Sequence, residues 1–389
     1  MSEVSEGARR FPTASPDGEI ARVLLAFLAT AGIFYVNIMP AIVDGLIEGL
    51  NFSNREAGLV ASSNTYGAAF GAFIVVFFVK RLDWRKASYA LLLALLVMDL
   101  GSIVIQEAGT MIAARAVHGF VGGALVGIGF SVMSRTSEVS RTFGYLLTIQ
   151  FGLGGLGIIY LPPLAPVFGT KALFLALAAF SFVTLLMVPF LASYPAGENH
   201  HGRAVGKIRY LPAAAALLAT FLFQAANMGI YAYSIGIGKF AGLTPSFVSD
   251  SFGVAAWVAI AGSVLVILIS TRFGRLLPVA AATWALHHSA VNPDSWLSSV
   301  FWLAQLTIGI MWAFVISYLL GMNAEFDATG QMAALGGFAS KMGLASGPAV
   351  AAMIVGESNY GFVINVATVA LVLALFVVLM PARVLHSGT

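Results

Sequence analysis

The chain has 389 residues, of which 59% are hydrophobic and 10% are charged, with a formal net charge of +3 and a mean hydropathy of +0.91. A soluble domain carries about 25% charged residues, so this composition excludes a single aqueous core and indicates that lipid is the solvent. The small net charge gives no reason to expect nucleic acid as a partner. Because the chain has no cysteine, disulfides, thiolate catalysis and cysteine-based metal sites are excluded.

Residues 1–19 are polar and lack the apolar core of a signal peptide, which predicts a short cytoplasmic tail. Apolar runs of about 20 residues then recur at short intervals and predict membrane helices. A membrane β-barrel would need short alternating strands, whereas runs such as 91–98 are continuously apolar. The predicted helices are 20–45, 56–79, 87–106, 109–134, 142–164, 170–193, 209–237, 247–270, 274–290, 296–322, 329–355 and 358–382.

Lysine and arginine are distributed unequally between the loops that join these helices. With the N-terminus inside, the outside loops hold only Arg55, Lys171 and Lys239. All other lysines and arginines fall in inside segments, apart from Arg115 and Lys341. This positive-inside bias predicts two cytoplasmic termini and an even number of helices in a cell membrane, with the bacterial inner membrane as the expected location.

Two parts of the chain resemble each other at an offset of 191 residues. Gly71 and Arg81 match Gly262 and Arg272, and the same offset places Gln150 over Lys341. In a membrane chain, such a duplication indicates two helical bundles that face one pathway. The predicted domains are a tail at 1–19, an N-terminal bundle at 20–193, a cytoplasmic linker at 194–208, a C-terminal bundle at 209–383 and a tail at 384–389.

Basic turns follow the second and the eighth predicted helices, at Lys80-Arg-Leu-Asp-Trp-Arg-Lys86 and Thr271-Arg-Phe-Gly-Arg275. From Ile20 to Arg383 the chain is similar to the major facilitator superfamily, whose signature turn lies at these places. The resemblance implies an all-α membrane protein with twelve helices in two six-helix bundles. It also implies gating turns at Arg81, Arg85, Arg272 and Arg275. Both turns lack the acidic residue of the signature, and the alternative is that they only anchor the chain at the inner surface.

Few ionisable residues fall in the middle of predicted helices, where a charge costs roughly 2.5–3.5 kcal/mol. Asp99 and Arg115 each lie eight residues from Glu107, so adjacent helices place them at equal depth, about 12 Å from the turn. They form an ion pair, or else Arg115 binds an anion or tunes a proton site. Arg115 and Gly119 resemble the family's Arg-x-x-x-Gly pattern, which implies proton coupling. His118 either carries a coupling proton or is held neutral by a hydrogen bond.

Lys341 lies at the centre of the helix predicted over 329–355, with no acidic residue within one helical turn. This position favours a wet cavity and an anionic ligand, and by resemblance a lysine in this helix binds carboxylates in some organic-anion transporters. The alternative is pairing with Glu325 or Asp327. Asp44, near an outer helix end, is a protonatable gate residue or part of a solvated rim.

Neutral polar side chains complete the candidate cavity. The resemblance implies that the first, fourth, seventh and tenth helices line the pathway, with the second, fifth, eighth and eleventh beside them. The candidates for substrate contact are Asn37, Asn64, Tyr66, Gln150, Gln224, Asn227, Tyr231 and Gln305, with Trp257, Trp302 and Trp312 for stacking.

Three classes of function compete. We expect a secondary transporter, not an enzyme, that moves a small organic solute, such as a carboxylate, with coupling to protons or another ion. The substrate-binding candidates are Lys341, Arg115, Asn37, Tyr66, Gln150, Asn227, Tyr231 and Gln305; the proton-coupling candidates are His118, Asp99 and Asp44. A monomer in lipid without cofactor or metal is expected. The alternative is a proton-driven exporter of hydrophobic or cationic compounds, although the fifth helix lacks the Gly-Pro of the family's antiporters. The third class is a membrane enzyme or a non-transporting receptor; an enzyme would need a convergent nucleophile or metal cluster, and the adjacent His287 and His288 do not have the spacing of one.

Overall fold

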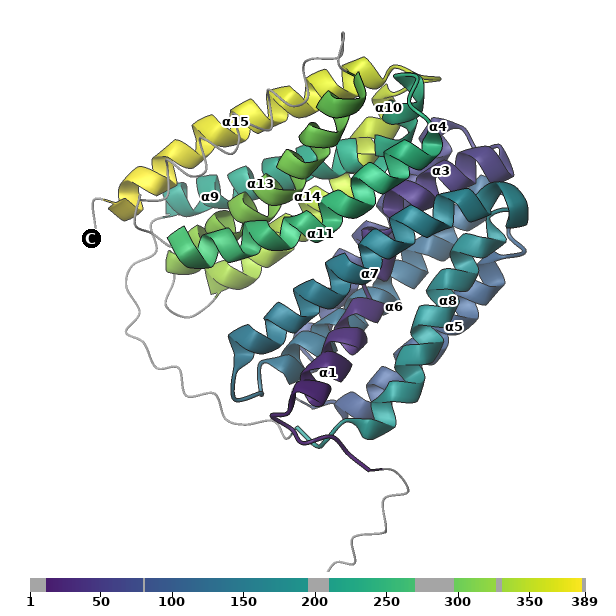
Figure 1. The fold of residues 1–389 in the computed structure, drawn as a ribbon. Helices are drawn as coiled ribbons and strands as arrows, with labels where there is room; N and C mark the ends of the chain where they lie inside the picture. The colour runs from purple at the N-terminus through teal and green to yellow at the C-terminus, as the bar shows by residue number, and fades with distance from the viewer. Residues whose placement is uncertain (1–11, 80, 195–209, 270–296, 327–330, 387–389) are drawn as a thin grey trace, which may run out of the picture.

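The structure, a computed structural model, describes residues 12–79, 81–194, 210–269, 297–326 and 331–386. Within these ranges the regular backbone is helical, which confirms the predicted all-α class (Figure 1). The helices are α1 (Glu19–Ala31), α2 (Phe34–Asn37), α3 (Met39–Leu50), α4 (Asn54–Val76), α5 (Trp84–Ser102), α6 (Ala108–Met133), α7 (Val139–Phe168), α8 (Lys171–Met187), η1 (Val188–Phe190), α9 (Tyr210–Ala232), α10 (Ser234–Phe240), α11 (Pro245–Ile269), α13 (Leu297–Glu325), α14 (Gln331–Ile354) and α15 (Tyr360–His386).

The first predicted span, 20–45, differs from expectation because it is broken into α1, α2 and α3. Pro40 stands in the first turn of α3, and a proline has no N–H to continue the hydrogen bonding of a preceding helix. The break leaves Asn37 at the end of α2, halfway along the span. The ninth predicted span, 274–290, lies outside the described residues.

The seventh predicted span, 209–237, is also interrupted, at Tyr233 between α9 and α10. The other predicted spans within the described residues coincide with helices of the structure. Seven of the described helices are long and apolar enough to cross a membrane by length and composition. The first span is not among these seven, because none of its helices α1, α2 and α3 is long enough to cross a membrane alone. A capping box starts α4, in which Ser53 N–H donates to the Glu56 carboxylate at 2.9 Å.

The helices form two groups (Figure 1). Elements α1 to α8 lie together on one side and α9 to α15 on the other. Each group has its own apolar core, with Leu28 and Leu125 buried in the first and Phe223 and Leu319 buried in the second. The predicted linker, 194–208, falls almost entirely outside the described residues, so its boundaries stay predictions.

Helices α4 and α6 pack at backbone distance. A Cβ atom on Gly119 would collide with the carbonyl of Asn64, and one on Gly123 would collide with the carbonyl of Ala68. In lipid, where apolar surfaces gain nothing from leaving water, such close backbone packing is a main source of helix association. The glycines therefore fix the position of α6, which carries Arg115 and His118.

We expect Gly123→Ala to destabilise the protein by about 1–3 kcal/mol, because the added methyl group forces α4 and α6 apart. Gly101→Ala in α5 is the matched control, since no atom lies within 4 Å of its added Cβ. There the loss of glycine flexibility stabilises the helix by up to about 1 kcal/mol. Thermal unfolding of the two detergent-purified variants measures the difference, and equal melting temperatures would contradict it.

Candidate functional site

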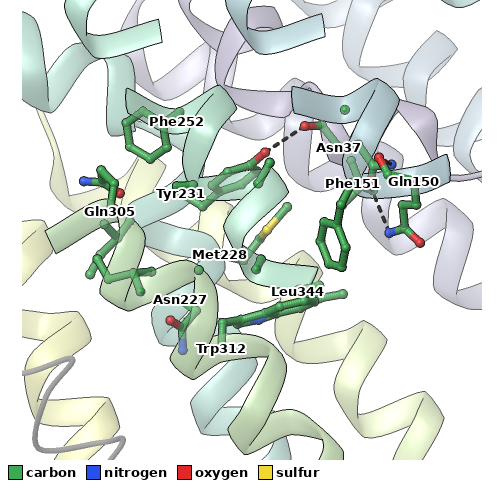
Figure 2. Close-up of a pocket in the computed structure, with 18 of the residues that line it drawn as sticks. Asn37, Gln150, Phe151, Asn227, Met228, Tyr231, Phe252, Gln305, Trp312 and Leu344 are labelled. Carbon is green, nitrogen blue, oxygen red and sulfur yellow. Dashed lines mark hydrogen bonds between the residues drawn. The ribbon is translucent and has the colours of Figure 1, made fainter. Parts of the chain in front are cut away.

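A pocket of about 190 Å³ lies between the two groups of helices. The N-terminal group contributes α2 and α7, and the C-terminal group contributes α9, α11, α13, α14 and α15. Five of the eight predicted substrate-binding residues line it, whereas Lys341, Arg115 and Tyr66 do not. The five are Asn37, Gln150, Asn227, Tyr231 and Gln305 (Figure 2).

Asn37 joins the two halves at the pocket wall. The hydroxyl of Tyr231 donates to the backbone carbonyl of Asn37 at 2.7 Å, from α9 to the broken first span. The Asn37 amide donates to the carbonyl of Gln150 at 3.1 Å, and the Gln150 amide donates to Asn37 Oδ1 at 3.1 Å (Figure 2). The break after α2 therefore gives the pocket a polar contact that spans both bundles.

Some polar groups of the pocket have no protein partner among the described residues. Gln305 is only 9% exposed, and neither its amide nitrogen nor its oxygen forms a hydrogen bond there. The Asn227 amide donates to the carbonyl of Phe223 at 2.8 Å, which leaves Oδ1 unused. Buried polar groups normally find partners, so these atoms are available to a ligand.

Aromatic side chains form much of the remaining wall. Phe151 of α7 and Trp312 of α13 meet edge to face with ring centroids 6.1 Å apart. Phe252 meets the Tyr231 ring at 6.3 Å. The tryptophans at 257 and 302 were stacking candidates as well, but Trp257 donates to the carbonyl of Gly152 and neither lines the pocket. Sequence patterns missed Phe151 and Phe252, because periodicity does not distinguish a pocket-lining phenylalanine from one that faces lipid.

Lys341 is half-buried on α14, one turn before Leu344 of the pocket. At 3.6 residues per turn, its side chain lies between Leu344 and Phe338, whose ring contacts Phe73 of α4 at 5.3 Å. Lys341 therefore faces the space between the bundles. Among the described residues its ammonium forms no ion pair or hydrogen bond. Of the alternative partners, Asp327 and the side chain of Glu325 lie outside the described part of the chain.

Arg115 and Asp99 form the ion pair that was one of the two expectations, with 2.7 Å between Nη1 and Oδ1. Arg115 also donates to the Ser102 hydroxyl and is fully buried. His118 Nε2 lies 3.1 Å from the same Asp99 oxygen, and the Asn64 amide lies 2.8 Å from His118 Nδ1. With Asn64 donating, Nε2 carries the histidine proton. This buried charge cluster lies inside the N-terminal bundle, away from the pocket.

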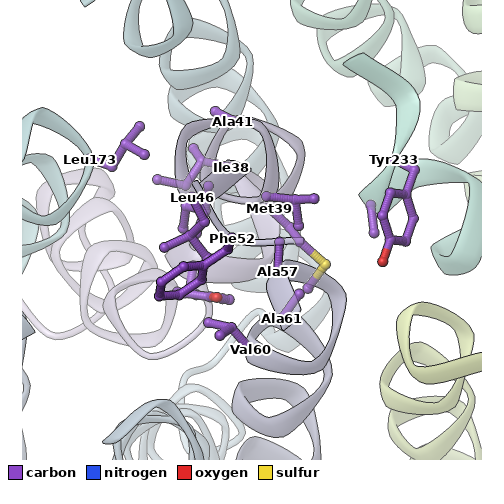
Figure 3. Close-up of a cluster of buried hydrophobic side chains, with 14 of the residues drawn as sticks. Ile38, Met39, Ala41, Leu46, Phe52, Ala57, Val60, Ala61, Leu173 and Tyr233 are labelled. Carbon is purple, nitrogen blue, oxygen red and sulfur yellow. The ribbon is translucent and has the colours of Figure 1, made fainter. Parts of the chain in front are cut away.

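Besides the two bundle cores, a further apolar cluster joins the bundles at one end of the molecule. The lysines and arginines of the loops predict that this is the outer end. The N-terminal half contributes Met39, Phe52 and Ala57 to this cluster, and Tyr233, the residue before α10, faces them from the C-terminal half (Figure 3). Tyr233 donates to the carbonyl of Asn54 at 2.6 Å. The Asn54 amide in turn donates to the carbonyls of residues 356 and 357, at 3.3 and 2.5 Å.

Lys239 of α10 adds an ionic contact at the same end. Its ammonium lies 2.6 Å from Asp44 and 3.2 Å from Glu48, both on α3. Within the described residues, these are the ion pairs that connect the two bundles. Tyr66 is also an interbundle contact, with its hydroxyl 2.7 Å from that of Ser346, outside the pocket.

The basic turn before α5 makes contacts within its own bundle. Arg85 donates to the carbonyls of Leu191 and Ala192, the latter at 3.0 Å, and Arg81 is exposed. Asp83 caps α5, and the backbone N–H of Lys86, together with that of Arg85, lowers the pKa of the Asp83 carboxyl below its usual value. The other two predicted gating residues, Arg272 and Arg275, lie outside the described residues.

We expect Asp99→Asn to destabilise the protein by about 3–5 kcal/mol, because it leaves Arg115 as a buried charge without its partner. The double variant Asp99→Asn/Arg115→Gln removes both charges and recovers much of the loss. Thermal unfolding measures stability. Uptake by the double variant tests function: normal uptake would exclude Arg115 as ligand or coupler.

We expect Lys239→Gln to weaken closure at the predicted outer end by about 1 kcal/mol, roughly a five-fold change in the closed-to-open ratio, since partly exposed ion pairs contribute this much. The chain has no cysteine, so Arg55→Cys and Ser358→Cys can be added and linked with a bifunctional maleimide. Both positions are exposed and flank the Asn54 contacts. The rate of cross-linking should fall in Lys239→Gln and stay unchanged in the control Lys171→Gln. Equal cross-linking rates in the two variants would show that the ion pairs of Lys239 do not hold this end closed.

Comparison with known proteins supports the same fold. No curated protein sequence matches the chain significantly. A structure of the nucleoside transporter NupG is 14% identical, with a TM-score of 0.71 over 93% of this chain and 99% of that one. A bacterial homologue of the human lysosomal transporter Spinster, inward-facing and occupied, is 12% identical with a TM-score of 0.72 over 97% and 98%. A D-xylose–proton symporter is 12% identical, with a TM-score of 0.67 over 91% and 96%.

At these identities the structures share the fold alone. The sequence match is more specific, because the family model for the Major Facilitator Superfamily aligns with residues 23–339, most of the chain. The paired bundles, the pocket between them and the apolar helices agree with that match. The chain therefore belongs to the Major Facilitator Superfamily and is a multi-pass membrane transporter, not an enzyme, that moves small solutes by alternating access.

Proposed function

We propose that the transported solute is an organic anion, such as a carboxylate, and that Lys341 binds its charge. The observation that carries this proposal is a half-buried ammonium without a partner among the described residues, one turn from pocket residue Leu344. A lysine at mid-membrane costs roughly 2.5–3.5 kcal/mol, and an anionic ligand offsets that energy when it binds.

The rest of the pocket supports recognition of a small polar solute. Its lining residues carry no charge, so Lys341 sets the electrostatic potential at its edge without competition from a lining acid. The Gln305 amide and Asn227 Oδ1 have no protein partner among the described residues, so they offer hydrogen bonds that orient the ligand.

We propose that protons drive transport, with two places where they can bind. His118 shares Asp99 with Arg115, so a proton on its Nδ1 would require the Asn64 amide to turn. Asp44 pairs with Lys239 while the outer end is closed. When that end opens, Asp44 loses its cationic partner and becomes a better proton acceptor.

A second candidate function is export of hydrophobic compounds, which the uncharged and largely apolar lining favours. Such an exporter would not need Lys341. The two functions therefore differ in whether transport depends on Lys341, and a substitution of this residue distinguishes them.

We expect Lys341→Gln to abolish stabilisation by carboxylates, whereas Lys341→Arg retains part of it. A ligand at 100 times its Kd stabilises a protein by about 2.7 kcal/mol, which is readily measured by thermal unfolding. A panel of organic acids supplies the ligands, and the exposed Lys171→Gln is the control for loss of one positive charge.

Uptake into proteoliposomes completes the test. Substrate-dependent alkalinisation of the outer solution supports proton symport. Unchanged uptake of an acid by Lys341→Gln would overturn the anion proposal, and protection of cells against hydrophobic dyes would favour the exporter.

A further inference from the structure

We propose that the solute is a planar aromatic acid with one ring and a polar ring substituent. This inference rests on the proposed anion function and specifies the rest of the ligand. Three features carry it: flat aromatic walls on both sides of the pocket, a chain of hydrogen bonds that connects one wall to the turn of Lys341, and an unpartnered amide at the other end.

One wall joins the two bundles, and the other belongs to the C-terminal bundle alone. Phe151 of the N-terminal half and Trp312 of the C-terminal half meet at one side, and Phe252 and Tyr231 stand at the other (Figure 2). Aromatic rings prefer offset or edge contacts with other rings, so a flat ring fits between these walls better than a puckered one. The cavity volume of about 190 Å³ suits a small, one-ring solute.

Trp312 is held in place by its own hydrogen bond. Its indole N–H donates to Gln224 Oε1 at 2.8 Å, and Gln224 Nε2 donates to the Ser340 hydroxyl at 2.8 Å. Ser340 precedes Lys341 on α14. These hydrogen bonds fix the indole ring relative to the turn of α14 that carries Lys341, and they leave the face of the ring available to the ligand.

Gln305 marks the opposite end of the ligand. It lies on α13 two turns before Trp312, about 10 Å along the helix, and therefore on the same face. Figure 2 places it beside Phe252 and Tyr231. Gln305 is only 9% exposed and its amide has no partner among the described residues, so a ligand hydroxyl or amide that reaches it gains a hydrogen bond that the empty pocket lacks. Gln305 is thus a specificity-determining residue.

The test measures apparent Kd by thermal unfolding of the full-length protein with four kinds of probe: benzoate, the hydroxybenzoate isomers, cyclohexanecarboxylate and benzamide. We expect benzoate to bind at least ten-fold more tightly than cyclohexanecarboxylate, which has the same charge without the flat ring. Trp312→Leu should remove that difference, whereas Trp312→Phe should keep most of it. One hydroxybenzoate isomer should bind more tightly than benzoate, and Gln305→Met should make the two equal.

Each of the other outcomes overturns one part of the proposal. Equal affinity for benzoate and cyclohexanecarboxylate would overturn the aromatic inference and leave the anion function standing. Binding of benzamide as tightly as benzoate would overturn the anion function and leave the aromatic walls as the recognition element. If none of the probes binds the wild type, the aromatic inference is wrong, and the panel of organic acids decides the anion function. If Gln305→Met retains the preference for a hydroxyl, Gln305 is not its determinant.

Discussion

Lipid offers no hydrogen bonds, and this constraint organises the interior of the protein. Every polar side chain inside a span must find a partner within the protein or open into a wet pathway. Arg115 meets the constraint by pairing with Asp99 and Ser102 deep in one bundle. Gln305 and Lys341 do not meet it among the described residues. Because Gln305 lines the pocket and Lys341 lies one turn from it, these unpaired groups are available to a ligand, whereas unpaired buried atoms elsewhere, such as the Tyr35 hydroxyl, are not.

The broken first span is where structure and pathway meet. A continuous helix would direct its polar groups along one face, whereas the end of α2 turns the Asn37 backbone toward Tyr231 of the other bundle. The contact is a single neutral hydrogen bond, which contributes about 1 kcal/mol and can break and reform as the bundles move. The charged contacts of Lys239 lie farther along, at one end of the molecule. A contact of this size at the pocket and several more at one end suit a protein in which the bundles rock about a central site.

Much of this arrangement follows from the sequence. Apolar runs predict most of the helices, and counting residues from a turn predicts that Asp99 and Arg115 lie at one depth. Five of the predicted polar residues line the pocket: four lie in the expected pathway helices, and Gln150 lies in the fifth helix beside them. The rotation of each helix about its axis is harder to predict, because almost every face is apolar in a membrane protein. Phe151 and Phe252 were missed for this reason. Tyr66, equally polar, contacts Ser346 instead because α4 and α14 pack against each other there.

The two bundles carry their charges differently, and this difference bears on recognition. In the N-terminal bundle, the acid and base of the buried charge cluster neutralise each other, so the cluster presents little net field to the pocket. In the C-terminal bundle, Lys341 has no such neighbour among the described residues. Helix α14 packs on α4 of the other half along much of its length, so the cation lies on the surface that one bundle presents to the other. A charge at that place experiences a wet environment when the pathway opens and a drier one when it closes. Binding an anion there reduces the energy of closing, because a neutral pair is easier to desolvate than a lone cation. Under the proposed anion function, the same ammonium would select the solute and favour the closed, occupied form.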